Sequence, residues 1–262
     1  MKNSSSFNLS NKNILITGSA GRIGSEVAKA ALEANAFVII TDIKETKLEK
    51  VYKKLSNLYP DKVLSFCADL SSQKGIEYLI NNALLKINKI DAAVHCAYPT
   101  SEGWGEGFEN LKSENLYQDL SMQLGGAIMF SQSIMRCFTK QKSGHLIHIS
   151  SIQGVQAPKF EHYVGTGMSS PIEYTAIKSG IIAITKWLAK YHHSQGIRVN
   201  CVSPGGILDS QPESFLNRYR NDCTNIGMLS PKDVASAIVF LLSPASIAIN
   251  GHNLIVDDGW TL

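Results

Sequence analysis

Short apolar runs alternate with longer amphipathic stretches along almost the whole chain. The runs are rich in Val and Ile and have few polar interruptions, which is typical of parallel strands buried on both faces. They predict about seven strands, at Asn13–Thr17, Phe37–Asp42, Lys62–Cys67, Asp91–Cys96, His145–Ser150, Ile197–Val202 and His252–Val256.

Between the strands, apolar residues recur at helical spacing. They predict helices at Arg22–Asn35, Glu45–Leu58, Ser72–Ile87, Ser113–Thr139, Ile172–Ser194 and Pro231–Leu242. Strands separated by helices favour right-handed crossovers, and therefore an α/β fold with a doubly wound parallel sheet and helices on both faces. We expect one domain over residues 1–262, with a polar N-terminal tail at residues 1–11.

A glycine-rich segment, Thr17–Gly24, follows the first strand and opens the first helix. Gly18 permits a tight turn, Gly21 allows the backbone to approach a pyrophosphate, and Gly24 allows close packing of helix against strand. The helix that begins at Arg22 directs its free N–H groups and positive dipole end towards that phosphate. The segment predicts a dinucleotide site.

The second strand ends at Asp42, whose carboxylate can accept both ribose hydroxyls of an adenosine and would repel a 2′-phosphate. NAD is therefore the preferred cofactor. Two nearby cations, Arg22 and Lys44, leave NADP open. Asp69 follows the third strand, where it could meet the adenine edge or cap the helix that begins near Ser72.

Tyr174 and Lys178 lie four residues apart on one face of a predicted helix. A tyrosine with its ordinary pKa of about 10 is a poor base at neutral pH. A neighbouring ammonium lowers that pKa, which makes the pair a candidate general acid/base, although such a pair also occurs on helix surfaces. Upstream, a strand ends at Ser150 and Ser151, where a hydroxyl could hold a substrate oxygen.

Taken together, these segments resemble the short-chain dehydrogenase/reductase family over nearly the whole chain. The matching pieces are Gly18–Gly24, Asp42, Asp69-Leu70, Ser151, Tyr174 with Lys178, Arg198–Gly205 and Asp257–Gly259. The length matches the compact branch of that family. The resemblance implies a Rossmann fold and an NAD(P)-dependent oxidoreductase that interconverts a secondary alcohol and a carbonyl.

The resemblance also implies roles for individual residues. Ser151 would position the carbonyl, Tyr174 would exchange the proton, and Lys178 would hold the nicotinamide ribose and lower the pKa of Tyr174. Backbone near Ile207 would pair with the nicotinamide carboxamide. The implied cofactor-binding residues are Gly18, Gly21, Arg22, Ile23, Gly24, Asp42, Asp69, Leu70, Ala97, Tyr174, Lys178, Pro204, Gly205 and Ile207.

Three features depart from the family pattern. The glycine spacing TGxxGxxG is more usual in the longer sugar-nucleotide branch. Where the family reads Asn-Asn-Ala-Gly, this chain has His95-Cys96-Ala97-Tyr98, so that only the Ala97 backbone carries over. The family's helix Asn, which supports a proton relay to the Lys, aligns with Gln123. We include Gln123 among the candidate catalytic residues.

Residues 152–172 form a longer segment than the family norm, and we expect an enlarged loop that arches over the active site. With Tyr98, Trp104 and Asp209 nearby by topology, it indicates a polar pocket with aromatic platforms, suited to a hydroxylated or phosphorylated sugar. Similar insertions occur among bacterial surface-sugar and flagellin-modification enzymes. The alternative is a self-packed loop that stabilises a dimer. Its polar residues are Gln153, Lys159, His162, Tyr163, Thr166, Ser169 and Ser170.

Composition narrows the partners. A net charge of +3 without a basic run argues against nucleic acid, and no stretch approaches the roughly 18 apolar residues of a membrane helix. The polar N-terminus lacks a secretion signal, and the five cysteines include no CxxC pair, which favours a cytoplasmic protein without a metal site. We expect a small-molecule substrate, and the resemblance implies a homodimer or homotetramer.

Three functions remain open on the sequence. The leading one is an NAD(P)-dependent dehydrogenase/reductase. The second is a sugar-nucleotide epimerase or dehydratase that keeps NAD through a full cycle, which the glycine spacing suggests. The third is a non-catalytic NAD-binding protein, suggested by the altered His95-Cys96 and Gln123 positions.

Overall fold

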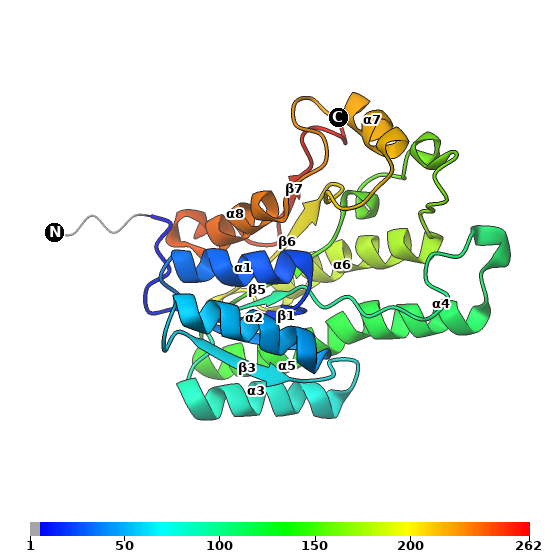
Figure 1. Ribbon diagram of the computed structural model, residues 1–262. Coiled ribbons are helices and arrows are strands. Elements are labelled where there is room, and N and C mark those ends of the chain that lie inside the picture. The colour runs from blue at the N-terminus through cyan, green and yellow to red at the C-terminus, as the bar shows by residue number, and fades with distance from the viewer. Residues whose placement is uncertain (1–5) are drawn as a thin grey trace.

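The computed structural model describes residues 6–262, in which a seven-stranded parallel sheet has helices on both faces (Figure 1). The strand order is β3-β2-β1-β4-β5-β6-β7, with every neighbouring pair parallel. The predicted doubly wound fold is confirmed. The strands are β1 (Asn13–Thr17), β2 (Phe37–Asp42), β3 (Val63–Cys67), β4 (Ala92–His95), β5 (Gly144–Ile149), β6 (Ile197–Pro204) and β7 (Asn253–Val256).

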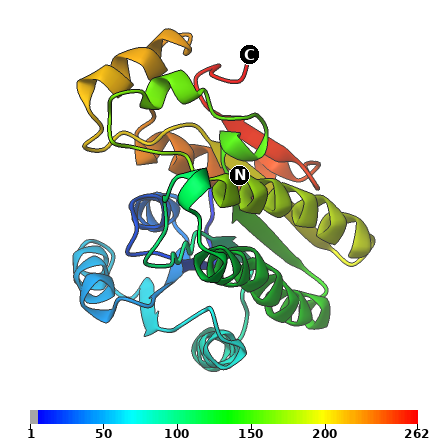
Figure 2. The same ribbon diagram turned by 90° about the vertical axis from the view of Figure 1, so that its right-hand side faces the viewer.

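The helices form two outer layers, one on each side of the sheet (Figure 2). Helices α1, α2 and α8 cover one face, and α3, α5 and α6 cover the other. Their bounds are α1 (Arg22–Glu33), α2 (Glu45–Leu58), α3 (Gln73–Ile87), α4 (Ser113–Asp119), α5 (Gly126–Gln141), α6 (Ile172–Tyr191), α7 (Glu213–Asn221) and α8 (Pro231–Leu242).

The central strands are apolar throughout because successive side chains enter different cores. Ile14 and Ile16 of β1 join the core beneath α1 and α8, whereas Leu15 joins the core beneath α3 and α5. Successive residues of a strand point to opposite faces, so burial on both faces requires apolar residues at every position. This explains why the apolar runs located the strands.

Two predicted elements differ from the structure. The helix expected at Ser113–Thr139 is divided into α4, a π-helical segment at Leu120–Gly125, and α5. Two adjacent glycines at its end weaken the regular helix, and wider turns are common beside functional sites. Of the N-terminal tail expected at residues 1–11, residues 1–5 lie outside the described residues. In the described part, Leu9 is buried and donates its N–H to the Ala34 carbonyl at 2.7 Å.

Thr17, the last residue of β1, fixes the segment that follows β4. Its buried hydroxyl oxygen accepts the N–H groups of Cys96 and Ala97, both at 3.1 Å, and shares a hydrogen bond with the His95 ring at 3.0 Å. The carboxyl ends of these two neighbouring strands are thereby joined. In doubly wound sheets, ligands bind beside such ends, where the strand order reverses.

Replacing Thr17 by Val keeps the side-chain shape and removes the acceptor for two backbone N–H groups. Each unpaired buried donor costs about 1–3 kcal/mol, so we expect the free energy of unfolding in urea to fall by about 2–4 kcal/mol. Thr17→Ser keeps the hydroxyl and is the matched control. Equal stability of the Val and Ser variants would contradict this role.

Candidate active site

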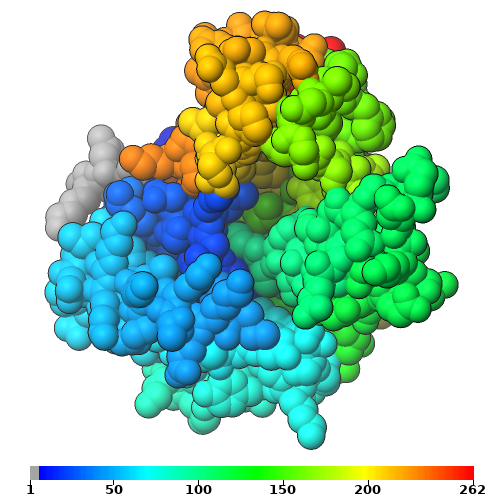
Figure 3. Space-filling view, turned by 45° about the vertical axis from the view of Figure 1, so that its right-hand side comes forward, coloured from blue at the N-terminus to red at the C-terminus, as the bar shows by residue number. Residues whose placement is uncertain are grey.

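A cavity of about 900 Å³ lies at the carboxyl ends of the strands. Figure 3 shows the hollow where the N-terminal segment, the segment around α4 and the α7 segment meet. Its size suits a dinucleotide with a small substrate. Of the predicted cofactor-binding and catalytic residues, all except Gln123 line this one cavity.

The glycine-rich turn forms one wall of the cavity. Gly18 has a φ of +61°, and a Cβ there would lie 2.6 Å from the Cys96 carbonyl oxygen. A Cβ on Gly24 would lie 2.3 Å from the Gly18 carbonyl oxygen. Gly21 has extended backbone and directly precedes α1. These contacts leave a backbone cradle at a helix N-terminus, which fits the pyrophosphate of a dinucleotide.

Two carboxylates line the nucleotide end of the cavity. Asp42 accepts the N–H groups of Ala20 and Lys44, each at 3.0 Å, so its position at the end of β2 is fixed. A carboxylate has about four acceptor positions, which leaves capacity for ribose hydroxyls. Asp69 accepts the N–H and hydroxyl of Ser71.

The two alternatives for Asp69 are now separated. The N-cap of α3 is Ser72, whose hydroxyl oxygen accepts the Gly75 N–H at 3.1 Å. Asp69 does not cap the helix and lines the cavity beside Leu70.

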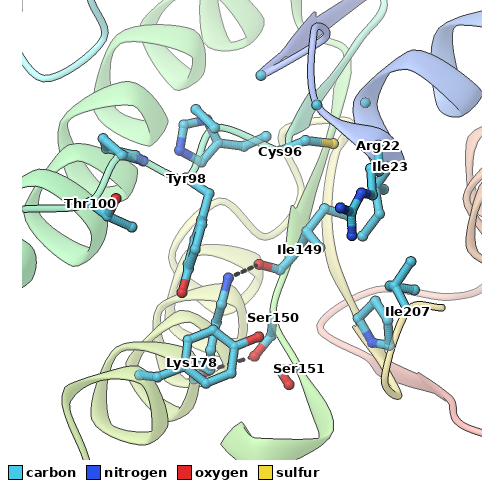
Figure 4. Close-up of a pocket in the computed structure, with 18 of the residues that line it drawn as sticks. Arg22, Ile23, Cys96, Tyr98, Thr100, Ile149, Ser150, Ser151, Lys178 and Ile207 are labelled. Carbon is cyan, nitrogen blue, oxygen red and sulfur yellow. Dashed lines mark hydrogen bonds between the residues drawn. The ribbon is translucent and has the colours of Figure 1, made fainter. Parts of the chain in front are cut away.

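Arg22 forms an ion pair that the sequence did not indicate. Its guanidinium binds the Asp209 carboxylate from the segment after β6, and Figure 4 shows Arg22 on the side of the pocket nearest Ile207. The contact joins the two sides of the nucleotide groove. Arg22 therefore has a carboxylate partner and is not a free cation beside the expected ribose. Lys44 lines the groove and forms no ion pair within residues 6–262.

The substrate end is built where β5 meets α6. The Ser151 hydroxyl faces the Tyr174 phenol and acts to lower its pKa. The Ser150 hydroxyl donates to the Lys178 carbonyl at 2.7 Å, and Lys178 Nζ donates to the Ile149 carbonyl at 3.1 Å (Figure 4). The end of β5 and the first turns of α6 thus hold the hydroxyls and the ammonium in one place.

Burial dominates the electrostatics of this pair. It raises the pKa of Tyr174 against the opposing hydrogen bond from Ser151, and it lowers the pKa of Lys178 to about 8. The expectation that Lys178 lowers the pKa of Tyr174 is not met in this structure, because loss of solvation outweighs the other effects on the buried phenol. Lys178 Nζ lies 5.5 Å from the Tyr174 ring centroid.

Three aromatic rings meet edge to face beside the ammonium. The centroid distances are 5.4 Å for Tyr98–Trp104, 5.9 Å for Tyr98–Tyr174 and 6.1 Å for Trp104–Tyr174. The segment that carries Tyr98 and Trp104 is anchored by Ser101, whose N–H and hydroxyl both donate to the buried Asp119 carboxylate at 2.7 Å. Of the three residues expected at the pocket from the sequence, Tyr98 lines the cavity, whereas Trp104 and Asp209 do not.

Gln123 lies in the π-helical segment and is 5% exposed. Neither atom of its amide group has a hydrogen-bond partner among residues 6–262, and Gln123 does not line the cavity. No hydrogen bond joins it to Tyr174 or Lys178 among the described residues, so its relay role stays a prediction.

The long loop at residues 152–172 packs against α7 and covers the substrate end. Arg218 of α7 donates to the carbonyls of Glu161, His162 and Val164. Asp222 binds Lys159 at 3.0 Å and also binds His162. Burial would raise the pKa of Asp222, but hydrogen bonds from Lys159 and His162 hold it below its ordinary value.

Sequence reasoning missed the aromatic side of this cover. Phe215 and Tyr219 from α7 and Trp260 from the C-terminal segment are buried and line the cavity with Tyr163. The four-residue spacing of Phe215 and Tyr219 was the available signal, because it places both rings on one face of an amphipathic helix.

Other polar groups have structural partners. The His145 ring forms hydrogen bonds with Arg198 and Asn200, so its two ring nitrogens are engaged there and not with His148. In residues 6–262, no group of three His, Cys, Asp or Glu side chains is arranged to hold a metal ion. None of the helices described has both the length and the apolar character needed to cross a membrane.

Several known proteins are similar to this chain in sequence and in fold. The profile of the family described as enoyl-(acyl carrier protein) reductase matches residues 18–261. The post-translational flagellin modification protein A of Campylobacter coli is 40% identical over 255 residues, which covers 97% of this chain and 100% of that protein.

Solved structures agree. A short-chain dehydrogenase from Leptospira borgpetersenii with bound NAD⁺ is 30% identical, with a TM-score of 0.86 and coverage of 98% of this chain and 95% of that one. A gluconate 5-dehydrogenase from Burkholderia cenocepacia, in complex with NADP and tartrate, is 22% identical and shares the fold, with a TM-score of 0.87 and 98% coverage of both chains.

The chain belongs to the short-chain dehydrogenase/reductase family. It is an NAD(P)-dependent oxidoreductase.

Proposed function

We propose that the chain interconverts a secondary alcohol and a carbonyl of a polar, sugar-like substrate, with Tyr174 as general acid/base. The observation that carries the proposal is the Ser151 hydroxyl acting on the buried Tyr174 phenol beside the Lys178 ammonium, at one end of a dinucleotide-sized cavity. A positioned hydroxyl pair of this kind can hold a substrate oxygen and exchange a proton with it.

Each group has a distinct part in this reaction. The nicotinamide cofactor, when bound, accepts or supplies the hydride. Ser151 orients the substrate oxygen, and Tyr174 donates a proton to it in reduction or removes one in oxidation. Lys178 holds the nicotinamide ribose, and its ammonium favours the phenolate in the transition state. Gln123 is proposed to support the return of the proton.

The cavity supports a hydroxylated or phosphorylated sugar as substrate. Beside Ser151 it is lined by Gln153, Lys159, His162 and Tyr163, which offer several hydrogen-bond donors. Lys159 and His162 bind Asp222, and Gln153 bonds with Tyr163, so these groups are held in place at the cavity wall, where substrate hydroxyls or phosphates can reach them. The 40% identity to a flagellin modification protein also supports this class.

Tyr174→Phe should lower kcat by at least about 100-fold, because it removes the proton donor, and should leave the NADH dissociation constant within about twofold. The measurement is NADH absorbance with a panel of sugar phosphates, sugar nucleotides and long-chain alcohols. Tyr78→Phe, at an exposed position on α3 outside the cavity, is the matched control.

Full turnover by Tyr174→Phe would contradict the tyrosine assignment, and turnover of long-chain alcohols alone would contradict the substrate class. A sugar product formed without net NADH change would favour the epimerase or dehydratase alternative. Cofactor binding without any product would favour the non-catalytic one.

We propose a preference for NAD over NADP. Asp42 places a carboxylate at the end of β2, beside the expected adenosine ribose, where it repels a 2′-phosphate. Of the two cations that could offset this repulsion, Arg22 is engaged by Asp209, whereas Lys44 has no ion pair in residues 6–262.

Asp42→Ala should shift the ratio of NADPH to NADH dissociation constants by about tenfold towards NADPH, equivalent to about 1.4 kcal/mol of removed repulsion. Fluorescence titration measures both constants. Asp69→Ala is the control, since it should affect both cofactors equally. An unchanged ratio in Asp42→Ala would refute the assignment.

We also propose a homodimer or homotetramer that pairs through α5 and α6. Trp187 and Tyr191 of α6 are 60% and 62% exposed and stack on each other at 4.7 Å. Ile128 and Met129 of α5 are also exposed. Large apolar groups gathered on helix faces are typical of association surfaces.

The free cysteines and the absence of a CxxC pair support a cytoplasmic location for this chain.

Trp187→Glu places a charge in the proposed interface and should convert the oligomer into a monomer, as measured by size-exclusion chromatography with light scattering. Lys186→Glu, at a neighbouring exposed position, controls for added negative charge. A monomeric wild-type protein would contradict the proposed association.

A further inference from the structure

The Lys178 ammonium is buried, with no carboxylate at ion-pair distance among residues 6–262. Within that range its one hydrogen bond is to the Ile149 carbonyl at 3.1 Å. A buried cation without a partner is costly, and an amine responds by losing its proton. Burial accordingly lowers the pKa of Lys178 to about 8.

The titratable groups that face Lys178 from neighbouring strands are neutral near pH 7. Burial raises the pKa of the Cys96 and Cys201 thiols to about 12. Burial also lowers the pKa of His95 on β4 and of His148 on β5 to about 3. None of these groups supplies a negative charge at neutral pH.

Two aromatic rings do face the ammonium, both with phenols whose pKa burial raises. Lys178 Nζ lies 4.9 Å from the centroid of Tyr98 and 5.5 Å from that of Tyr174, and Figure 4 shows Tyr98 extending alongside the lysine. The negative face of an aromatic ring attracts a cation, and more strongly where water is excluded, as it is around the 6%-exposed Lys178; the Tyr98 side chain itself is 42% exposed. Tyr98 is the closer of the two rings.

The backbone before Tyr98 and the ring beside it are held in place. The preceding N–H, of Ala97, donates to the Thr17 hydroxyl at 3.1 Å, and Trp104 packs edge to face on the Tyr98 ring. The ring departs from the Asn-Asn-Ala-Gly pattern of the family noted above. Gln123, by contrast, does not line the cavity.

We propose that Tyr98 is a positioning residue whose ring face keeps the Lys178 side chain charged and directed towards Tyr174. The catalytic consequence rests on the proposed function, in which Lys178 acts as an ammonium. The aromatic face, not the phenol hydroxyl, is the effective part. Phe at this position therefore preserves the effect, and Leu removes it.

The direct test is the titration of Lys178 itself, followed by NMR in protein with ¹³C-labelled lysine and assigned by the signal lost in Lys178→Arg. Tyr98→Leu should lower the pKa of Lys178 by about one unit, and Tyr98→Phe should leave it near the wild-type value. Tyr163→Leu removes another ring of the same cavity and should leave it unchanged. An unchanged or raised pKa in Tyr98→Leu would overturn the proposal.

The second readout is the pH profile of kcat/KM. Because activity requires the ammonium, the basic limb should move to lower pH in Tyr98→Leu by the same interval as the NMR titration, and Phe should restore it. A moved NMR titration with an unmoved rate profile would uphold the ring contact and refute the proposed catalytic role of Lys178. Failure of the NMR shift would refute the ring contact alone.

Discussion

The structure of the site depends on the close approach of two backbone segments, at Gly18 after β1 and at Cys96–Ala97 after β4. A side chain at Gly18 would overlap the Cys96 carbonyl, and Thr17 ties the same segment by two N–H bonds. This contact brings the phosphate-binding turn beside the segment that carries Tyr98. The glycine-rich turn and the segment with Tyr98 are therefore packed together at the point where the strand order reverses.

Burial sets the chemistry on the other side of the cavity. It suppresses ionisation of the thiols, imidazoles and phenols that surround Lys178, and the nearby carboxylates of Asp119 and Glu173 are also buried and act on the Tyr98 phenol. In such a low-dielectric site a fixed charge acts strongly on a developing oxyanion. The cover formed by the 152–172 loop and α7 contributes to this environment, held by Arg218 and Asp222.

Local patterns were sufficient for most of the fold and for most of the candidate site. Strands buried on both faces must be apolar throughout, so the apolar runs located them. The glycines of the turn after β1 stand where backbone contacts exclude a Cβ. Helical spacing placed Tyr174 and Lys178 on one face of a helix. The Arg22–Asp209 pair and the packing of the 152–172 loop on α7 join residues distant in sequence, so no local pattern contains them. The π-helical segment depends on a small balance of hydrogen bonding within a helix. The Tyr174 pKa follows burial, which only the assembled structure reveals.

The central claim is that hydride and proton reach the substrate in this one cavity. The most direct measurement is reduction of the carbonyl substrate with NADH deuterated at the transferred position of nicotinamide C4, followed by mass spectrometry and NMR of the product. The account predicts one deuterium per product, on the carbon that bears the new hydroxyl, and none from solvent D₂O on that carbon. Deuterium taken from D₂O at that carbon, or product without label, would contradict direct hydride transfer.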